Sequence, residues 1–227
     1  MRLPHSAAST QRAFTLIELL VVISIIAVLM GLLFPVANMM KENGRKVTAR
    51  SDVMATINAT KYYFTEYGKY PELQIPAIAT EDAYAGDPAT ALTTPINNSA
   101  LYDSLRAIGL RINVDHILNP KRVIFLEAKS VAKVTAPRGG FLDKAGAAGG
   151  DSTLEGCWFD PWGKQYNIGI DRNYDNQVDM SKIYKDITLI DSPRTGVTAF
   201  ALGSDNAVGD KKTAGKLAGS DDVASWQ

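Results

Sequence analysis

The sequence predicts an α+β protein in which one long N-terminal helix packs on a small antiparallel β-sheet. Three observations support this prediction. The run Leu19–Val36 contains no charged residue, polar sequence with helical spacing follows it, and short segments rich in β-formers alternate with turn residues between Gln165 and Leu202. The first half of the helix is expected to span a membrane, and its second half is expected to cover the sheet.

The composition is that of an ordinary folded chain, with 227 residues, 46% hydrophobic and 21% charged. The 24 basic residues balance the 24 acidic ones, so nucleic acid is not expected as a partner, because its binding needs a clustered basic excess. Cys157 is the single cysteine, which excludes an internal disulfide. The sequence shows no nucleophile elbow, zincin helix or glycine-rich phosphate loop, and we expect no enzyme.

The N-terminal apolar segment is long enough to cross a bilayer. As a helix, residues 14–37 would extend about 36 Å, against a hydrocarbon core of about 30 Å. Arg2 and Arg12 precede it without any acidic residue, so the positive-inside rule keeps the N-terminus cytoplasmic. A secretory signal peptide and a plain one-pass anchor are the alternatives. The apolar run is too long for a typical signal peptide and ends without an A-x-A pattern. The plain anchor does not explain Glu18, whose carboxylate costs about 2 to 3 kcal/mol in lipid unless it has a partner.

The stretch AFTLIELL, residues 13–20, resembles the prepilin-type N-terminal cleavage/methylation motif of type IV pilins and type II secretion pseudopilins. The resemblance implies that prepilin peptidase cuts between Ala13 and Phe14 and methylates the new N-terminus at Phe14. It also implies that Glu18 pairs with the N-terminal amine of a neighbouring subunit during assembly, which would compensate its buried charge. One departure is Ala13, because the family usually has glycine before the cut.

Past the apolar run the helix is expected to continue to Tyr67. Met40, Val47 and Met54 recur every seven residues, with Arg50, Ile57 and Phe64 offset by three, and this pattern predicts a helical face. Pro35 should kink or loosen the helix. Gly68 and a nearby proline supply the stop signal. The expected organisation is a leader at 1–13, a membrane or filament-core helix at 14–37, its amphipathic continuation at 38–71, a variable loop and short-helix region at 72–158, and a sheet with a C-terminal loop at 159–227.

The rest of the chain is expected to form a pilin-like head on the second half of the helix. Ser99–Ile108 is predicted to be a short helix and Arg122–Ala128 a strand. A three-stranded antiparallel sheet is predicted from Gln165–Ile170, Ile183–Ile190 and Val197–Leu202. The stretch DPWGKQY, residues 160–166, resembles the turn that leads into the pseudopilin sheet, and its composition predicts a Pro-Gly turn with aromatic side chains in the core.

The C-terminal acidic loop, between residues 202 and 226, resembles the calcium-binding loop of major pseudopilins. The resemblance implies calcium as a cofactor, held by the side chains of Asp205 and of Asp221 or Asp222, with the carbonyl of Leu202. Flexible acidic loops supply the six to eight oxygen ligands that Ca²⁺ takes. A solvated polar tail is the alternative.

A second candidate metal site lies in the loop Asp171–Asp179. Asp171, Asn173, Asp175 and Asp179 supply oxygens at positions 1, 3, 5 and 9, as in an EF-hand loop. The glycine of position 6 is missing, and Lys182 stands at position 12, where a bidentate carboxylate belongs. A polar hairpin turn is the alternative.

The resemblance is closest to the major pseudopilin and implies a structural subunit of a type II secretion pseudopilus, which supports protein transport across the outer membrane. The implied place is the inner membrane, with the head in the periplasm. The implied partners are further copies and other pseudopilins, prepilin peptidase, the inner-membrane secretion assembly platform and membrane lipid. One alternative is a type IV pilin or minor pilin-like subunit acting in adhesion, motility or DNA uptake. The other is a membrane-anchored extracytoplasmic enzyme or binding domain.

Overall fold

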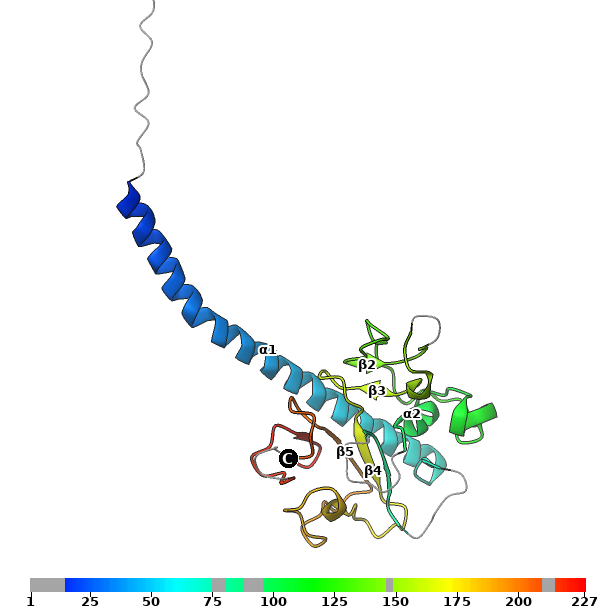
Figure 1. Ribbon diagram of the computed structural model, residues 1–227. Coiled ribbons are helices and arrows are strands. Elements are labelled where there is room, and N and C mark those ends of the chain that lie inside the picture. The colour runs from blue at the N-terminus through cyan, green and yellow to red at the C-terminus, as the bar shows by residue number, and fades with distance from the viewer. Residues whose placement is uncertain (1–14, 75–80, 88–95, 146–148, 210–214) are drawn as a thin grey trace, which may run out of the picture. The chain divides into compact units, whose positions relative to one another are not determined.

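The computed structural model describes residues 15–74, 81–87, 96–145, 149–209 and 215–227 (Figure 1). The chain divides into two compact units, Met1–Gly44 and Arg45–Gln227. Helix α1 (Leu16–Tyr67) contributes its first part to the first unit and its last part to the second. The leader expected at 1–13 lies outside the described residues.

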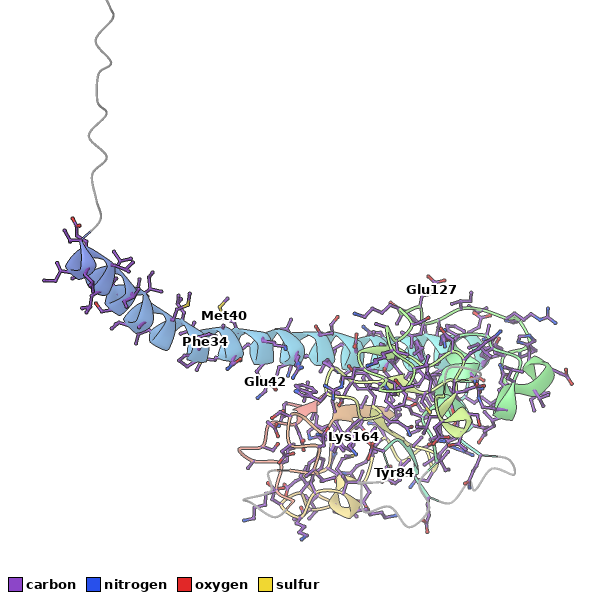
Figure 2. All side chains as sticks on the ribbon, turned by 45° about the horizontal axis from the view of Figure 1, so that its top comes forward. Phe34, Met40, Glu42, Tyr84, Glu127 and Lys164 are labelled. Atoms are coloured by element: carbon purple, nitrogen blue, oxygen red, sulfur yellow. The ribbon has the colours of Figure 1, made fainter. Side chains whose placement is uncertain are left out.

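In the first unit α1 is a bare apolar helix. Its side chains are exposed along the described length, and Phe34 and Met40 project from it with 68% and 70% of their surface accessible (Figure 2). Pro35 lies inside the helix. Within the described residues, α1 is the one helix whose length and composition suit a membrane span.

The C-terminal end of α1 lies where the sequence predicts it. Gly68 adopts a positive φ of 68°, and its N–H donates to the carbonyl of Phe64 at 2.8 Å. This left-handed conformation favours glycine and closes the last turn. Beyond it, Pro71 has no N–H with which to continue the helix.

The face of α1 that packs on the head agrees with the predicted one only in part, since Ile57 is buried but Val47 and Met54 are not. Val47 is 71% exposed and Met54 42%. The buried side chains are mostly small or hydroxyl-bearing and recur three or four positions apart: Ala49, Val53, Thr56, Ile57, Ala59, Thr60 and Tyr63. The hydroxyls of Thr56 and Thr60 donate hydrogen bonds to the backbone carbonyls four residues earlier, at 3.0 and 2.8 Å. Many residues of the buried face are not strongly apolar. A repeat of apolar residues in the sequence therefore does not identify this face.

The head contains a four-stranded antiparallel sheet in the order β1-β4-β5-β6, one strand more than predicted. Its strands are β1 (Ala83–Ala85), β4 (Asn167–Ile170), β5 (Val197–Ala201) and β6 (Val223–Ala224). The strands predicted at Gln165–Ile170 and Val197–Leu202 are confirmed as β4 and β5. Both lie beside the C-terminal part of α1, as Figure 1 shows.

Strand β5 is buried on both faces. Val197, Ala199 and Ala201 belong to the main core, which they share with α1. Phe200 and Leu202 belong to a second core, which lies on the opposite face because side chains alternate along a strand. The sheet therefore has a cover besides the helix.

The strand predicted at Ile183–Ile190 is wrong, because this segment forms part of that second cover. It follows a short 3₁₀ helix, η4 (Met180–Lys182), and consists of turns. Ile183 and Tyr184 bury their side chains in the second core, whereas Ile190 is 85% exposed. The apolar residues of this segment pack irregularly on the second core and do not form a β-ladder with a neighbouring strand.

The region between α1 and β4 contains helix α2 (Ser99–Leu105), the 3₁₀ helices η1 (Arg111–His116) and η3 (Ser152–Leu154), and a two-stranded sheet of β2 (Gly140–Phe141) and β3 (Trp158–Phe159). The predicted helix is thus confirmed, although it ends at Leu105. The strand predicted at Arg122–Ala128 is wrong. Both Phe125 and Leu126 donate their N–H groups to the Leu105 carbonyl, at 2.9 and 3.3 Å, instead of to a neighbouring strand.

The turn before β4 anchors the sheet to α1. The Oδ1 atom of Asp160 accepts hydrogen bonds from the N–H groups of Trp162, Gly163 and Lys164, at 2.8, 2.7 and 3.0 Å. Just after the turn, the Tyr166 hydroxyl donates to Asp52 of α1 at 2.7 Å. Trp162 and Tyr166 are buried in the main core, as predicted.

Candidate functional site

Glu18 lies in the first turn of α1 and caps it. Its Oε2 atom accepts hydrogen bonds from the N–H of Thr15, at 2.9 Å, and from the Thr15 hydroxyl, at 2.7 Å. The Glu18 N–H lies 3.3 Å from the same hydroxyl oxygen. This reciprocal arrangement is a capping box. Thr15 is not among the predicted site residues, although Thr-x-x-Glu before an apolar run is the sequence signature of a capping box.

The helix that Glu18 opens is unsuited to water. Leu16 is 83% exposed, Ile17 is 73% exposed, and an 18-residue window of α1 has a mean hydropathy of 2.9 with none of it buried. So large an apolar surface must be covered by lipid or by other apolar helices. Ala13 and Phe14, the residues of the expected cut, lie outside the described residues.

The C-terminal loop brings two of the predicted calcium ligands together. Asp221 accepts hydrogen bonds through Oδ2 from the N–H and hydroxyl of Ser204, each at 2.5 Å, and from the N–H of Asp205 at 3.3 Å. Gly203 has φ of 67°, and a Cβ atom there would lie 2.6 Å from the Asp221 carboxyl carbon. A larger residue at 203 would therefore separate the two segments of the loop.

Asp222 points to the interior beside them. Its Oδ2 atom accepts from the Tyr184 hydroxyl at 3.0 Å and from the Gly209 N–H at 2.8 Å. Burial raises the pKa of Asp222 to about 7, and the carboxylates of Asp221 and Asp205 act in the same direction. The buried Leu202 directly follows β5, at the start of the same loop.

The second acidic loop folds around its first residue. Asp171 accepts from the N–H of Asn176 at 2.8 Å, and the amide of Asn173 donates to Asp175 at 3.0 Å. The Oδ1 atom of Asp179 accepts from the N–H of Ser181 at 3.0 Å, at the start of η4.

Asp82, which is not among the predicted site residues, also lies beside this loop. Asp82, just before β1, accepts a hydrogen bond from the backbone N–H of Asp179 at 2.7 Å. Burial raises the pKa of Asp82, and the nearby charges of Asp171 and Asp175 contribute to the same shift. No signal in the sequence pairs residue 82 with residue 179, because the contact depends on β1 joining β4.

Neither loop has a preformed metal centre. In the part of the chain that the structure describes, no three side chains among His, Cys, Asp and Glu converge closely enough to hold a metal ion. Any cation must therefore draw on backbone carbonyl, amide or water oxygens as well, which Ca²⁺ accepts more readily than zinc does.

Comparison with known proteins assigns the N-terminal segment. No curated protein and no solved structure matches the chain. A family model described as the prokaryotic N-terminal methylation motif matches residues 8–34, which include Ala13, Phe14, Glu18 and the exposed first part of α1. Residues 8–34 thus carry a prepilin-type N-terminal motif, which supports a membrane-anchored, pilin-like protein that is processed by prepilin peptidase.

Proposed function

We propose that this chain is a structural subunit of a type II secretion pseudopilus. The observation that carries the proposal is the exposed apolar part of α1, which opens with Glu18 inside the matched methylation motif. Prepilin peptidase would cut between Ala13 and Phe14 and methylate Phe14. The subunit would rest in the inner membrane with its N-terminus cytoplasmic and its head periplasmic.

Polymerisation would bury the apolar helices of neighbouring subunits against one another. A carboxylate among such helices is tolerated only with a positive partner close by, and the N-terminal amine of Phe14 in an adjacent copy would supply it. The Glu18 pair would then set the register between subunits. Other pseudopilins and the inner-membrane assembly platform would be further partners.

A type IV pilin or minor pilin-like subunit is the second candidate. The motif is common to both systems, and the region 72–158 supports a more specialised subunit, because it adds a helix and a second small sheet to the helix-and-sheet head. Loss of exoprotein secretion on deletion of the chain would support the pseudopilus. Loss of surface filaments with normal secretion would support the pilus.

The first test is mass spectrometry of the N-terminal peptide of the protein isolated from its own membranes. We expect a chain that begins with N-methylated Phe14. An intact Met1 terminus, or a cut beyond Ala37, would contradict the filament proposal and leave an ordinary anchor or a secreted protein.

We also propose that the C-terminal loop binds calcium through Asp205, Asp221, Asp222 and the Leu202 carbonyl. The hydrogen bonds that hold Asp221 against Ser204 and Asp205 support it, because they bring both segments of the loop to one place. Ca²⁺ should raise the unfolding temperature of the full-length protein in detergent, by mass action on the folded state. Asp221→Asn should remove the part of that rise that depends on this loop.

A further inference from the structure

A small acidic pocket lies at the far end of strand β4, distinct from the C-terminal loop. Its volume is about 230 Å³, and its lining includes Asp82, Asn173, Asp175, Asp179 and Lys182. Lys182 lies 3.7 Å from Glu81, and its charge also acts on Asp82, where it lowers the pKa of that carboxyl against the effect of burial. This one cation faces several carboxylates. The pocket is therefore rich in oxygen atoms and carries a negative charge.

The sheet register places a second carboxylate, that of Asp171, across from Asp82, which lines this pocket. Ala83 of β1 pairs with Ile170 of β4, so the next position along the antiparallel ladder sets Asp82 against Asp171. Like charges at directly opposed positions destabilise a sheet. This arrangement needs a compensating positive group.

Each of these carboxylates is fixed by one oxygen and leaves the other without a partner. The Oδ2 atom of Asp82 accepts from the Asp179 N–H at 2.7 Å, and Oδ2 of Asp171 accepts from the Asn176 N–H at 2.8 Å. The Oδ1 atoms of Asp82 and Asp171 are both buried and have no hydrogen-bond partner among the described residues. Asp171 as a whole is only 2% exposed. Buried carboxylate oxygens without partners are costly, and a cation between them would remove that cost.

The loop that carries Asp171 shares one backbone feature with an EF-hand loop, at its sixth position. Asn176 occupies the position where EF-hand loops have glycine, and it has the positive φ, 64°, that this position requires. Asparagine tolerates this conformation better than most residues. Asn176 thus adopts the left-handed backbone conformation for which EF-hand loops use glycine.

We propose that Asp82 supplies the carboxylate that the loop lacks at Lys182, and that Asp82 and Asp171 bind a Ca²⁺ ion together with Asn173 and Asp175. The last two side chains are exposed and would turn inward, and water would complete the shell. Oxygen-only ligands in a flexible loop favour Ca²⁺ over zinc or copper. The ion would tie the edge strand β1 to the loop after β4, in a head whose one cysteine cannot form a disulfide within the chain.

The test is Ca²⁺ binding to the full-length protein in detergent, after chelation, by equilibrium dialysis with Asp82→Asn. We expect this variant to bind one ion fewer than the wild type, or that ion at least about tenfold more weakly, because affinity follows the number of charged ligands. Asp115→Asn is the matched control, since Asp115 is exposed and has a φ of 53° that asparagine accepts. Equal Ca²⁺ binding by the Asp82 and Asp115 variants would overturn the proposal, as would a wild type that binds no ion.

Thermal unfolding separates a binding role of Asp82 from a structural one. In chelator, Asp82→Asn should be at least as stable as the wild type, because one of two opposed charges is gone. With Ca²⁺ the wild type should become the more stable of the two. A variant that is destabilised equally with and without Ca²⁺ would contradict a ligand role. Asp221→Asn, in the C-terminal loop, should keep the Asp82-dependent ion, so failure of either calcium proposal can be recognised separately.

Discussion

Glu18 accepts two hydrogen bonds from Thr15, one from its N–H at 2.9 Å and one from its hydroxyl at 2.7 Å. These bonds give Glu18 a role within its own chain, because they cap the first turn of α1. The proposed role in assembly is different, since it requires the negative charge and a positive partner from another subunit. The two roles can be separated because glutamine serves a capping box as well as glutamate does.

We predict that Glu18→Gln and Glu18→Ala both abolish polymerisation while leaving the protein in the membrane. Glutamine keeps the cap but loses the charge, and alanine loses both. Filament yield after shearing, compared with the amount of protein in the membrane fraction, measures the effect. If Glu18→Gln assembles normally and Glu18→Ala does not, capping alone explains the residue. Thr15→Ala, which weakens the cap but keeps the charge, should still assemble.

A second prediction concerns the bond between Tyr166 and Asp52. Tyr166→Phe leaves a largely buried carboxylate without its donor, so we expect a loss of about 1 to 2 kcal/mol in the free energy of unfolding. The matched variant is Tyr102→Phe, which removes a buried bond of 3.0 Å between two neutral hydroxyls, Tyr102 and Thr56. It should cost less, about 0.5 to 1 kcal/mol. Urea unfolding followed by tryptophan fluorescence measures both, and a larger loss for Tyr102→Phe would contradict this account.

The sequence predicts those parts of the fold that rest on local signals. The end of α1 follows from Gly68, and strands β4 and β5 follow from β-rich stretches between turns. Strands β2, β3 and β6 have two residues each, too few to show an alternating pattern. The stretch 183–190 has an apolar pattern but no neighbouring strand to pair with. Whether a segment has such a neighbour depends on the tertiary packing and not on its own sequence.

The candidate sites divide in the same way. Glu18 is predicted from its sequence neighbours, and Asp205 and Asp221 are predicted as ligands from the resemblance of their loop to the C-terminal loop of pseudopilins. Asp82 is found only from the structure, because its hydrogen-bond partner Asp179 lies 97 residues away in the sequence and reaches it through the β1–β4 ladder. Long-range pairing of this kind leaves no trace in local composition.

A third prediction tests Asn98, which precedes α2 without capping it. Its side chain is fully buried and makes three hydrogen bonds, donating to the carbonyls of Trp158 and Tyr166, each at 2.9 Å, and accepting from the Trp158 N–H at 3.0 Å. Asn98→Ala would remove the side-chain partner of the Trp158 N–H and of the Tyr166 carbonyl, whereas the Trp158 carbonyl keeps the Tyr166 N–H at 3.2 Å, so we expect a cost of about 2 kcal/mol or more. The neighbouring Asn97→Ala, at a partly exposed position, should cost less than about 1 kcal/mol. Similar losses for the two variants in urea unfolding would contradict the link between α2 and β3.

The last prediction concerns the pH dependence of stability and rests on Asp160. Burial raises the pKa of Asp160 to about 6, although three backbone N–H groups donate to its Oδ1 atom. Between about pH 4 and pH 6 the folded state therefore keeps a proton that the unfolded chain has released. The stability that Asp160 contributes is present at low pH and decreases as the pH rises through this window, by up to about 3 kcal/mol.

Asp160→Asn should remove this loss, because asparagine keeps an acceptor oxygen for the same N–H groups and does not titrate. We expect the variant to gain stability relative to the wild type as the pH rises from 4 to 7, and to be the more stable protein at pH 7. Urea unfolding at several pH values measures the difference, with Asp115→Asn as a control for loss of one exposed carboxylate. A difference between variant and wild type that stays constant from pH 4 to 7 would show that Asp160 is ionised throughout. In that case its three hydrogen bonds, rather than its burial, would determine its charge state.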